Sequence, residues 1–82
     1  MKEKLISELG DSLNEIGVVI DDVYTEKEGH DEYLRVVLDR DEIIDIDTVV
    51  KATKIIDPII EKLELVKGEY ILDVYAKQKG DN

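Results

Sequence analysis

The chain has 82 residues, no cysteine, and 21 acidic against 11 basic side chains, giving a net charge of −10 at pH 7. This length suits one small domain, and the lack of cysteine excludes disulfides and thiolate metal sites. The negative charge opposes free binding to nucleic acid or anionic membranes, since both need clustered Lys and Arg. Hydrophobic residues make up 43% of the chain, so we expect a folded domain. Without a transmembrane run or a signal-peptide pattern, the expected location is cytoplasmic.

The N-terminal segment predicts an amphipathic helix. Leu5, Leu9, Leu13 and Ile16 recur at spacings of three and four residues, which places them on one helical face. Gly17 follows directly, at the position where glycine commonly ends a helix.

Two strands are predicted next, because β-branched residues replace the helical period. They span residues 18–25 and 33–39, and the polar residues 26–31 between them predict a hairpin loop. In the second strand the side chains alternate between the two faces of the sheet. One face receives Leu34, Val36 and Leu38, and the other receives Tyr33, Arg35, Val37 and Asp39.

A second helix is predicted to begin near Asp45 or Asp47, either of which can cap it. Its expected apolar face comprises Ile46, Val49, Val50, Thr53, Ile56, Ile60 and Leu63. Pro58 lies within this pattern, so we expect a kink or a break there. After a turn at residues 67–69, a third strand is predicted over residues 70–77, with side chains that alternate between its two faces. One face receives Tyr70, Leu72, Val74 and Ala76, and the other receives Ile71, Asp73, Tyr75 and Lys77.

The order helix–strand–strand–helix–strand predicts a two-layer α+β fold, in which two helices pack on one face of a three-stranded sheet. Residues 1–77 form the single expected domain, and residues 78–82 are expected to be a flexible tail.

No arrangement of residues indicates catalysis or a cofactor. His30 lies alone in the predicted hairpin loop, without a positioned nucleophile or carboxylate. A calcium loop counted from Asp39 would need glycine at its sixth position, which is Ile44. We therefore expect a protein that is not an enzyme and has no catalytic residues, metal site or cofactor.

Several short motifs, taken in order, resemble the N-terminal domain of the ribosome maturation factor RimP family. The family's "L-R-V-x-I-D" strand is matched by residues 34–39, its "I-x-L-D-D" helix entry by residues 44–48, and its "G-x-Y-x-L-E-V" strand by residues 68–74. The family continues with an "S-S-P-G" turn and a second, SH3-like domain, whereas this sequence has "Y-A-K-Q" and stops at residue 82. A domain fragment is one explanation, but the altered turn favours a short or divergent relative that lacks the second domain.

The resemblance implies a non-enzymatic factor for assembly of the small ribosomal subunit that binds a basic ribosomal protein or the immature subunit. The charge distribution favours such a partner, because residues 21–47 hold eleven acidic and three basic side chains. The expected contact surface comprises Asp21, Asp22, Glu26, Glu28, Asp31, Glu32, Asp39 and Asp41.

Two other functions stay open. The edge strand at residues 70–77 could pair with a copy of itself, in a protein-interaction or homo-oligomeric module unrelated to ribosomes. Alternatively, aromatic side chains on the outer face of the sheet could stack with RNA bases. The residues expected to form that face are Tyr33, Arg35, Tyr75 and Lys77.

Overall fold

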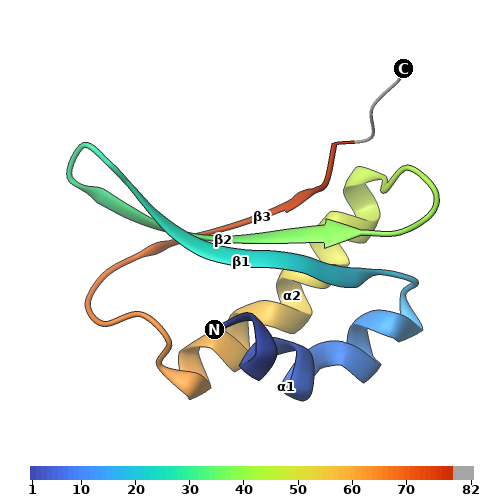
Figure 1. Cartoon of the computed structure of the whole chain (residues 1–82), viewed down its shortest axis with the longest axis horizontal. Coiled ribbons are helices and arrows are strands. Elements are labelled where there is room, and N and C mark those ends of the chain that lie inside the picture. The colour runs from blue at the N-terminus through green and yellow to red at the C-terminus, as the bar shows by residue number, and fades with distance from the viewer. Residues whose placement is uncertain (79–82) are drawn as a thin grey trace.

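The computed structural model describes residues 1–78, which form two helices and a mixed three-stranded sheet. The elements are α1 (Lys2–Glu15), β1 (Val19–Glu28), β2 (Asp31–Asp39), α2 (Ile46–Leu63) and β3 (Ile71–Ala76). Both helices lie on one face of the sheet, and no described element covers the other face (Figure 1). The predicted α+β fold with two layers is confirmed. Of the tail predicted at residues 78–82, all but Gln78 lies outside the described residues.

Helix α1 has the predicted apolar face and the predicted end. Leu5, Leu9 and Leu13 are buried, as their four-residue spacing requires. Gly17 follows the helix with φ of +83°, in the left-handed region that glycine enters without steric cost. Its N–H donates to the carbonyl of Asn14 at 2.9 Å, which satisfies one of the free carbonyls at the helix end.

The hairpin between β1 and β2 is longer than the sequence indicated. Glu28 pairs with Asp31, so the loop consists of Gly29 and His30 alone and the prediction of a loop over residues 26–31 is wrong. Gly29 has φ of +64°, which the favoured two-residue loops require at their first position. Both faces of the sheet are exposed at this end, so apolar and polar residues do not alternate along the strands here. The sequence therefore lacks the pattern that indicates a strand.

A β-bulge interrupts β1 near its start. The pairing register shifts between Ile20 and Asp22, which leaves Asp21 as the extra residue. Ile20 and Val23 are both buried in the core although they lie three positions apart. The bulge therefore directs two consecutive aspartates away from the core, an arrangement that simple alternation along a strand would not produce.

The middle strand of the sheet is β2, and its two partners run in different directions. β1 pairs with it in antiparallel orientation, and β3 pairs with it in parallel orientation after the chain crosses over through α2. Leu34, Val36 and Leu38 are fully buried against the helices, as predicted. Val37 is also buried, although it belongs to the outer face, where it lies opposite Tyr75 of β3.

Helix α2 runs from Ile46 to Leu63 without interruption, so of the kink or break predicted at Pro58 the break does not occur. A proline in this position removes one backbone hydrogen bond, to the carbonyl four residues earlier. Pro58 and Lys54 are both exposed, so water can bond that carbonyl. The buried residues Ile56 and Ile60 hold the helix against the core on either side of Pro58.

The start of α2 agrees with the prediction, but the burial of its first residues does not. Asp45 is the N-cap, and its carboxylate accepts hydrogen bonds from the N–H and the hydroxyl of Thr48. Both bonds lower the pKa of Asp45, and the bond from the Thr48 hydroxyl has the larger effect. Ile46 and Val50, which were expected in the core, are exposed over 73% and 45% of their surface. The buried residues of α2 are Ile56 and Ile60, as predicted, and Ala52, which was not among the predicted residues.

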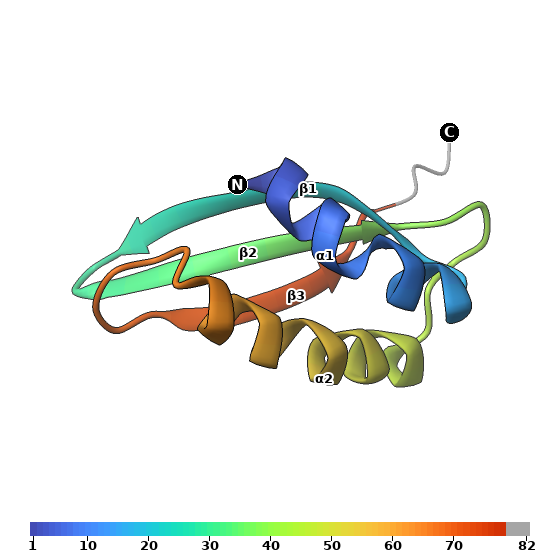
Figure 2. The same ribbon diagram turned by 90° about the horizontal axis from the view of Figure 1, so that it is seen from below.

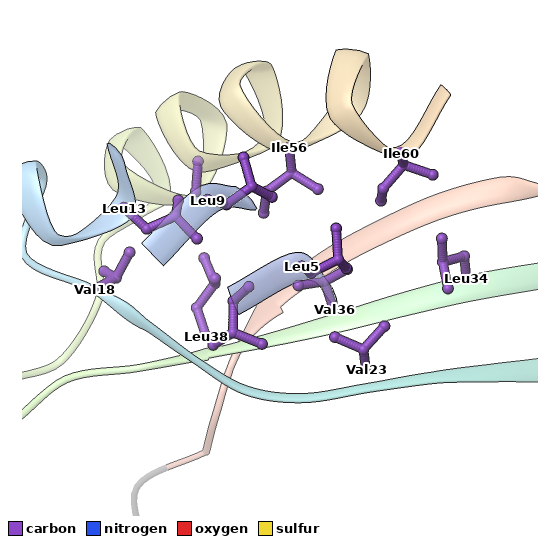
Figure 3. Packing of buried hydrophobic residues seen from close by; sticks show 12 residues of the cluster. Leu5, Leu9, Leu13, Val18, Val23, Leu34, Val36, Leu38, Ile56 and Ile60 are labelled. Atoms are coloured by element: carbon purple, nitrogen blue, oxygen red, sulfur yellow. The ribbon is translucent and has the colours of Figure 1, made fainter. Parts of the chain in front are cut away.

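The core lies between the sheet and the two helices and is entirely apolar; within residues 1–78 no polar side chain is buried. Figure 3 shows the α1 leucines and the α2 isoleucines pointing toward one another and toward β2. Since burial of apolar area is the main stabilising term in a domain this small, its stability depends on these few side chains.

A matched pair of substitutions in α2 tests this assignment of the core. Ile56→Ala should lower the free energy of unfolding by about 2–5 kcal/mol, because it leaves a cavity among buried side chains. Ile46→Ala, the same change at an exposed site of the same helix, should change it by less than about 0.5 kcal/mol. Urea unfolding followed by circular dichroism measures both, and equal losses would contradict the assignment.

Candidate protein-binding surface

Arg35 occupies the centre of the uncovered face of the sheet and contacts three carboxylates. Its Nε lies 2.8 Å from Glu26, its Nη2 lies 2.6 Å from Glu28, and its Nη1 lies 2.5 Å from Asp73. Its guanidinium carbon lies 4.5 Å from the ring centroid of Tyr33, so the cation also stacks on an aromatic face. Partial burial disfavours the charged form, but the bonds to Asp73 and Glu26 outweigh this effect and raise the pKa of Arg35.

The register of the sheet explains how three strands reach one guanidinium. Arg35 lies opposite Tyr24 of β1 and opposite Asp73 of β3. Glu26 and Glu28 follow Tyr24 at two-residue steps, so their side chains are on the same face. The three hydrogen bonds to charged oxygens therefore join β1, β2 and β3 on the side that the helices leave open.

Two further contacts complete this outer face. The hydroxyl groups of Tyr24 and Tyr75 lie 2.8 Å apart and share a hydrogen bond between β1 and β3. Nζ of Lys77 lies 3.3 Å from Oδ1 of Asp21, the bulge residue. Each of these two contacts spans the middle strand, whereas those of Arg35 join the middle strand to each of its neighbours.

The four residues predicted to stack with RNA thus lie on one face, but they contact partners in this chain. Arg35 donates to three carboxylates and stacks on Tyr33, while Tyr75 is bonded to Tyr24 and Lys77 is paired with Asp21. Sequence reasoning did not single out Tyr24 and Asp73. The alternation in β3 had placed Asp73 and Tyr75 on one face, but the contacts of Asp73 with Arg35 and of Tyr75 with Tyr24 require the parallel register of β3 with β2.

The eight acidic residues of the predicted contact surface form two groups at opposite ends of the β1–β2 hairpin. Glu26, Glu28, Asp31 and Glu32 lie near the tip, and Asp21, Asp22, Asp39 and Asp41 lie near the bulge and the end of β2. Glu26, Glu28 and Asp21 are engaged in the ion pairs above.

The other acidic residues of this set differ in their contacts. Asp22 accepts the N–H of Val23 at 2.9 Å, and Asp39 accepts that of Arg40 at 2.8 Å. Asp31 and Asp41 are exposed, and Glu32 is partly buried. Among the described residues, these last three carboxylates have no hydrogen-bond or ion-pair partner.

A groove of about 490 Å³ lies on the helix side of the hairpin tip, between the tip, the second half of α2 and the start of β3. Its lining includes His30 and five carboxylates, those of Asp31, Glu32, Asp57, Glu61 and Glu69. Tyr70 lies at the same place, and burial together with the negative charges of Asp57 and Glu61 raises its pKa. The groove is thus a region of negative potential that the sequence did not indicate, because its acids come from three separate segments.

Within residues 1–78 no three His, Asp or Glu side chains come close enough together to hold a metal ion. Neither helix is long and apolar enough to cross a membrane. The charged groups described above form ion pairs and exposed acidic surfaces.

A family model described as the RimP N-terminal domain matches residues 8–76. The matched range begins within α1 and includes the hairpin, α2 and β3, so it contains Arg35 and all three of its carboxylate partners.

The hydrogen bond between Tyr24 and Tyr75 predicts a loss of stability in alkali. This bond, with partial burial, raises the pKa of Tyr75 to about 12. The unfolded chain should ionise this tyrosine near pH ~10, so the stabilisation is complete below that pH and is lost as the pH rises toward about 12. Urea midpoints and absorbance titration of the tyrosines should show both effects.

The substitution Tyr24→Phe should move the Tyr75 titration toward the ordinary tyrosine pKa and reduce the alkaline loss of stability. Tyr33→Phe is the matched control, because among described residues the Tyr33 hydroxyl makes no hydrogen bond. A titration curve for Tyr75 that is unchanged in Tyr24→Phe would show that the bond does not control this pKa.

Proposed function

The chain belongs to the RimP N-terminal domain family of ribosome maturation factors, which confirms the resemblance, and from this premise we propose that it acts by binding, without catalysis. The proposed partner is a basic protein of the small ribosomal subunit, free or within the immature subunit. The proposed place of action is the cytoplasm, and the proposed contact surface is the acidic set of eight residues on the β1–β2 hairpin and the loop after it.

The uneven charge distribution is the observation that carries this proposal. Residues 21–47 have a net charge of −8 out of −10 for the whole chain. This count includes the two arginines of the segment, and both are engaged within the chain: Arg35 contacts three carboxylates, and Arg40 donates to the carbonyl of Ile43. A surface of this kind speeds the encounter with a basic partner and disfavours an acidic one.

RNA binding through the outer face is supported less well. A phosphate or base that approached Arg35 would compete with Glu26, Glu28 and Asp73, which already occupy all three of its nitrogens. The two excess negative charges of that cluster would also repel the RNA backbone. Binding of protein-free small-subunit RNA as tight as that of the immature subunit would nevertheless favour the RNA alternative.

Neutralising part of the acidic surface tests the proposal. The variant Asp22→Asn, Asp31→Asn, Asp41→Asn should weaken binding to immature small subunits by about tenfold or more at low salt, because it removes three negative charges from the contact surface. The difference from the native protein should shrink as ionic strength rises, since the Debye length is ~10 Å at 0.1 M salt. Sedimentation of labelled protein with purified immature subunits measures the affinity.

A matched control carries the same change in net charge on α1. Glu3, Asp11 and Glu15 are exposed there, and Glu3→Gln, Asp11→Asn, Glu15→Gln should leave binding close to that of the native protein. Equal losses in the two variants would mean that net charge alone matters. Native affinity in the hairpin variant would refute the proposed surface.

A further inference from the structure

The two edges of the sheet differ in how they are protected. The edge strand β1 has a bulge at Asp21 and charged residues along its length, features that discourage pairing with another strand. In addition, Asp22 accepts the N–H of its neighbour Val23 at 2.9 Å. β1 is therefore a guarded edge.

The other edge strand, β3, lacks this protection. Its six residues include no proline and no lysine, and its register with β2 is regular from Ile71 to Ala76. Its one charged residue, Asp73, is bonded to Arg35. The N–H of Lys77 donates to Leu38 of β2 at 2.7 Å. Successive residues of a strand direct their backbone N–H and C=O groups to opposite sides. Because Lys77 faces β2, the N–H and C=O groups of residues 72, 74 and 76 face the open edge.

One stripe of α2 lies beside this open edge. Its residues recur at spacings of three and four, so they share a helical face: Ile46, Val50, Thr53, Asp57 and Glu61. Asp57 and Glu61 line the groove at the start of β3, whereas Lys62 lies 3.9 Å from Glu8 on the side of α1. The stripe is therefore on the β3 side of the helix.

The stripe has an apolar end and an acidic end. Figure 2 shows that α2 and β3 run in opposite directions, so the beginning of α2 is near the end of β3. The apolar end, with Ile46 and Val50 exposed over 73% and 45% of their surface, lies beside the last residues of β3. The acidic end lies beside its first residues, at the groove with five carboxylates.

We propose that the open edge of β3 binds an extended segment of a basic protein as a fourth strand of the sheet. Backbone hydrogen bonds to residues 72, 74 and 76 supply the pairing, as in other cases of strand addition. A lysine or arginine of the segment enters the acidic groove, and an apolar side chain covers Ile46 and Val50. The inference rests on the proposed function for the nature of the partner and adds the binding site and the conformation of the bound segment.

Charge complementarity selects this occupant over a second copy of the chain. Each copy has a net charge of −10, so pairing two β3 edges would bring two acidic molecules together. A basic segment would instead neutralise the carboxylates of the groove, which have no lysine or arginine among the residues that line it.

A pair of synthetic peptides tests the proposal without ribosomes. One probe is a ten-residue peptide of alternating arginine and valine, and the other has the same arginines with proline in place of valine, so that it cannot add as a strand. The first peptide should slow hydrogen exchange at the amides of Leu72, Val74 and Ala76 and should bind at least tenfold tighter than the second. Equal binding of both peptides, without protection of these amides, would overturn the proposal.

The variant Ala76→Pro tests the same edge in the whole chain. It removes one N–H that faces the open edge and leaves the bonds to β2 in place. Thr25→Pro is the matched control on the guarded edge, and thermal unfolding checks that both variants fold. Only Ala76→Pro should weaken the binding of the arginine–valine peptide and of immature small subunits, by about tenfold.

Two results would separate this inference from the proposed function. If immature subunits bind the native protein and Ala76→Pro equally, the β3 site is wrong while the proposed function stands; if the peptide binds at β3 but immature subunits do not bind, the proposed function fails instead. Sedimentation of the chain alone decides the occupant: a dimer that Ala76→Pro dissociates would show that a second copy binds the edge and would overturn the proposal.

Discussion

The contacts of Arg35 connect the three strands on the face that the helices leave uncovered. The middle strand supplies the cation, β1 supplies two carboxylates and β3 supplies the third. Without a positive charge at this point, these carboxylates would lie close together in a chain that already has ten excess negative charges. Solvent-accessible ion pairs contribute little one at a time, but here one guanidinium satisfies three acids and stacks on a ring, so its contacts act as a network.

The two faces of the sheet therefore have separate roles. The helix face contains the apolar core, in which α1 and α2 contribute leucine, isoleucine and alanine side chains in helical spacing. The outer face is held by polar and charged contacts between strands. Because the core contains only apolar side chains, charged residues at the hairpin and around the groove can vary without disturbing the packing between the layers. This separation is expected where a small domain functions through its surface.

The predictable part of the fold was the part with a regular apolar pattern. The leucines of α1 and the alternation in β2 identified two elements and most of the core, because burial imposes a period on the sequence. The hairpin tip lacked such a pattern, so Glu26 and Glu28 were assigned to a loop although they belong to β1. Pro58 was given too much weight, since tertiary packing of Ile56 and Ile60 overrides a single missing hydrogen bond. The Arg35 contacts and the acidic groove depend on the register and crossover of β3, which no local sequence pattern encodes.

The parallel pairing of β3 has a consequence for the order of folding. The hairpin closes over a two-residue loop and can form as soon as its own residues are available, whereas Arg35 and Asp73 are 38 positions apart in sequence. Joining segments so distant costs loop-closure entropy that is recovered only after α2 has formed and packed. During synthesis from the N-terminus the third carboxylate would reach Arg35 last, after most of the domain has left the ribosome. The Arg35–Asp73 contact thus forms only when β3 joins the sheet.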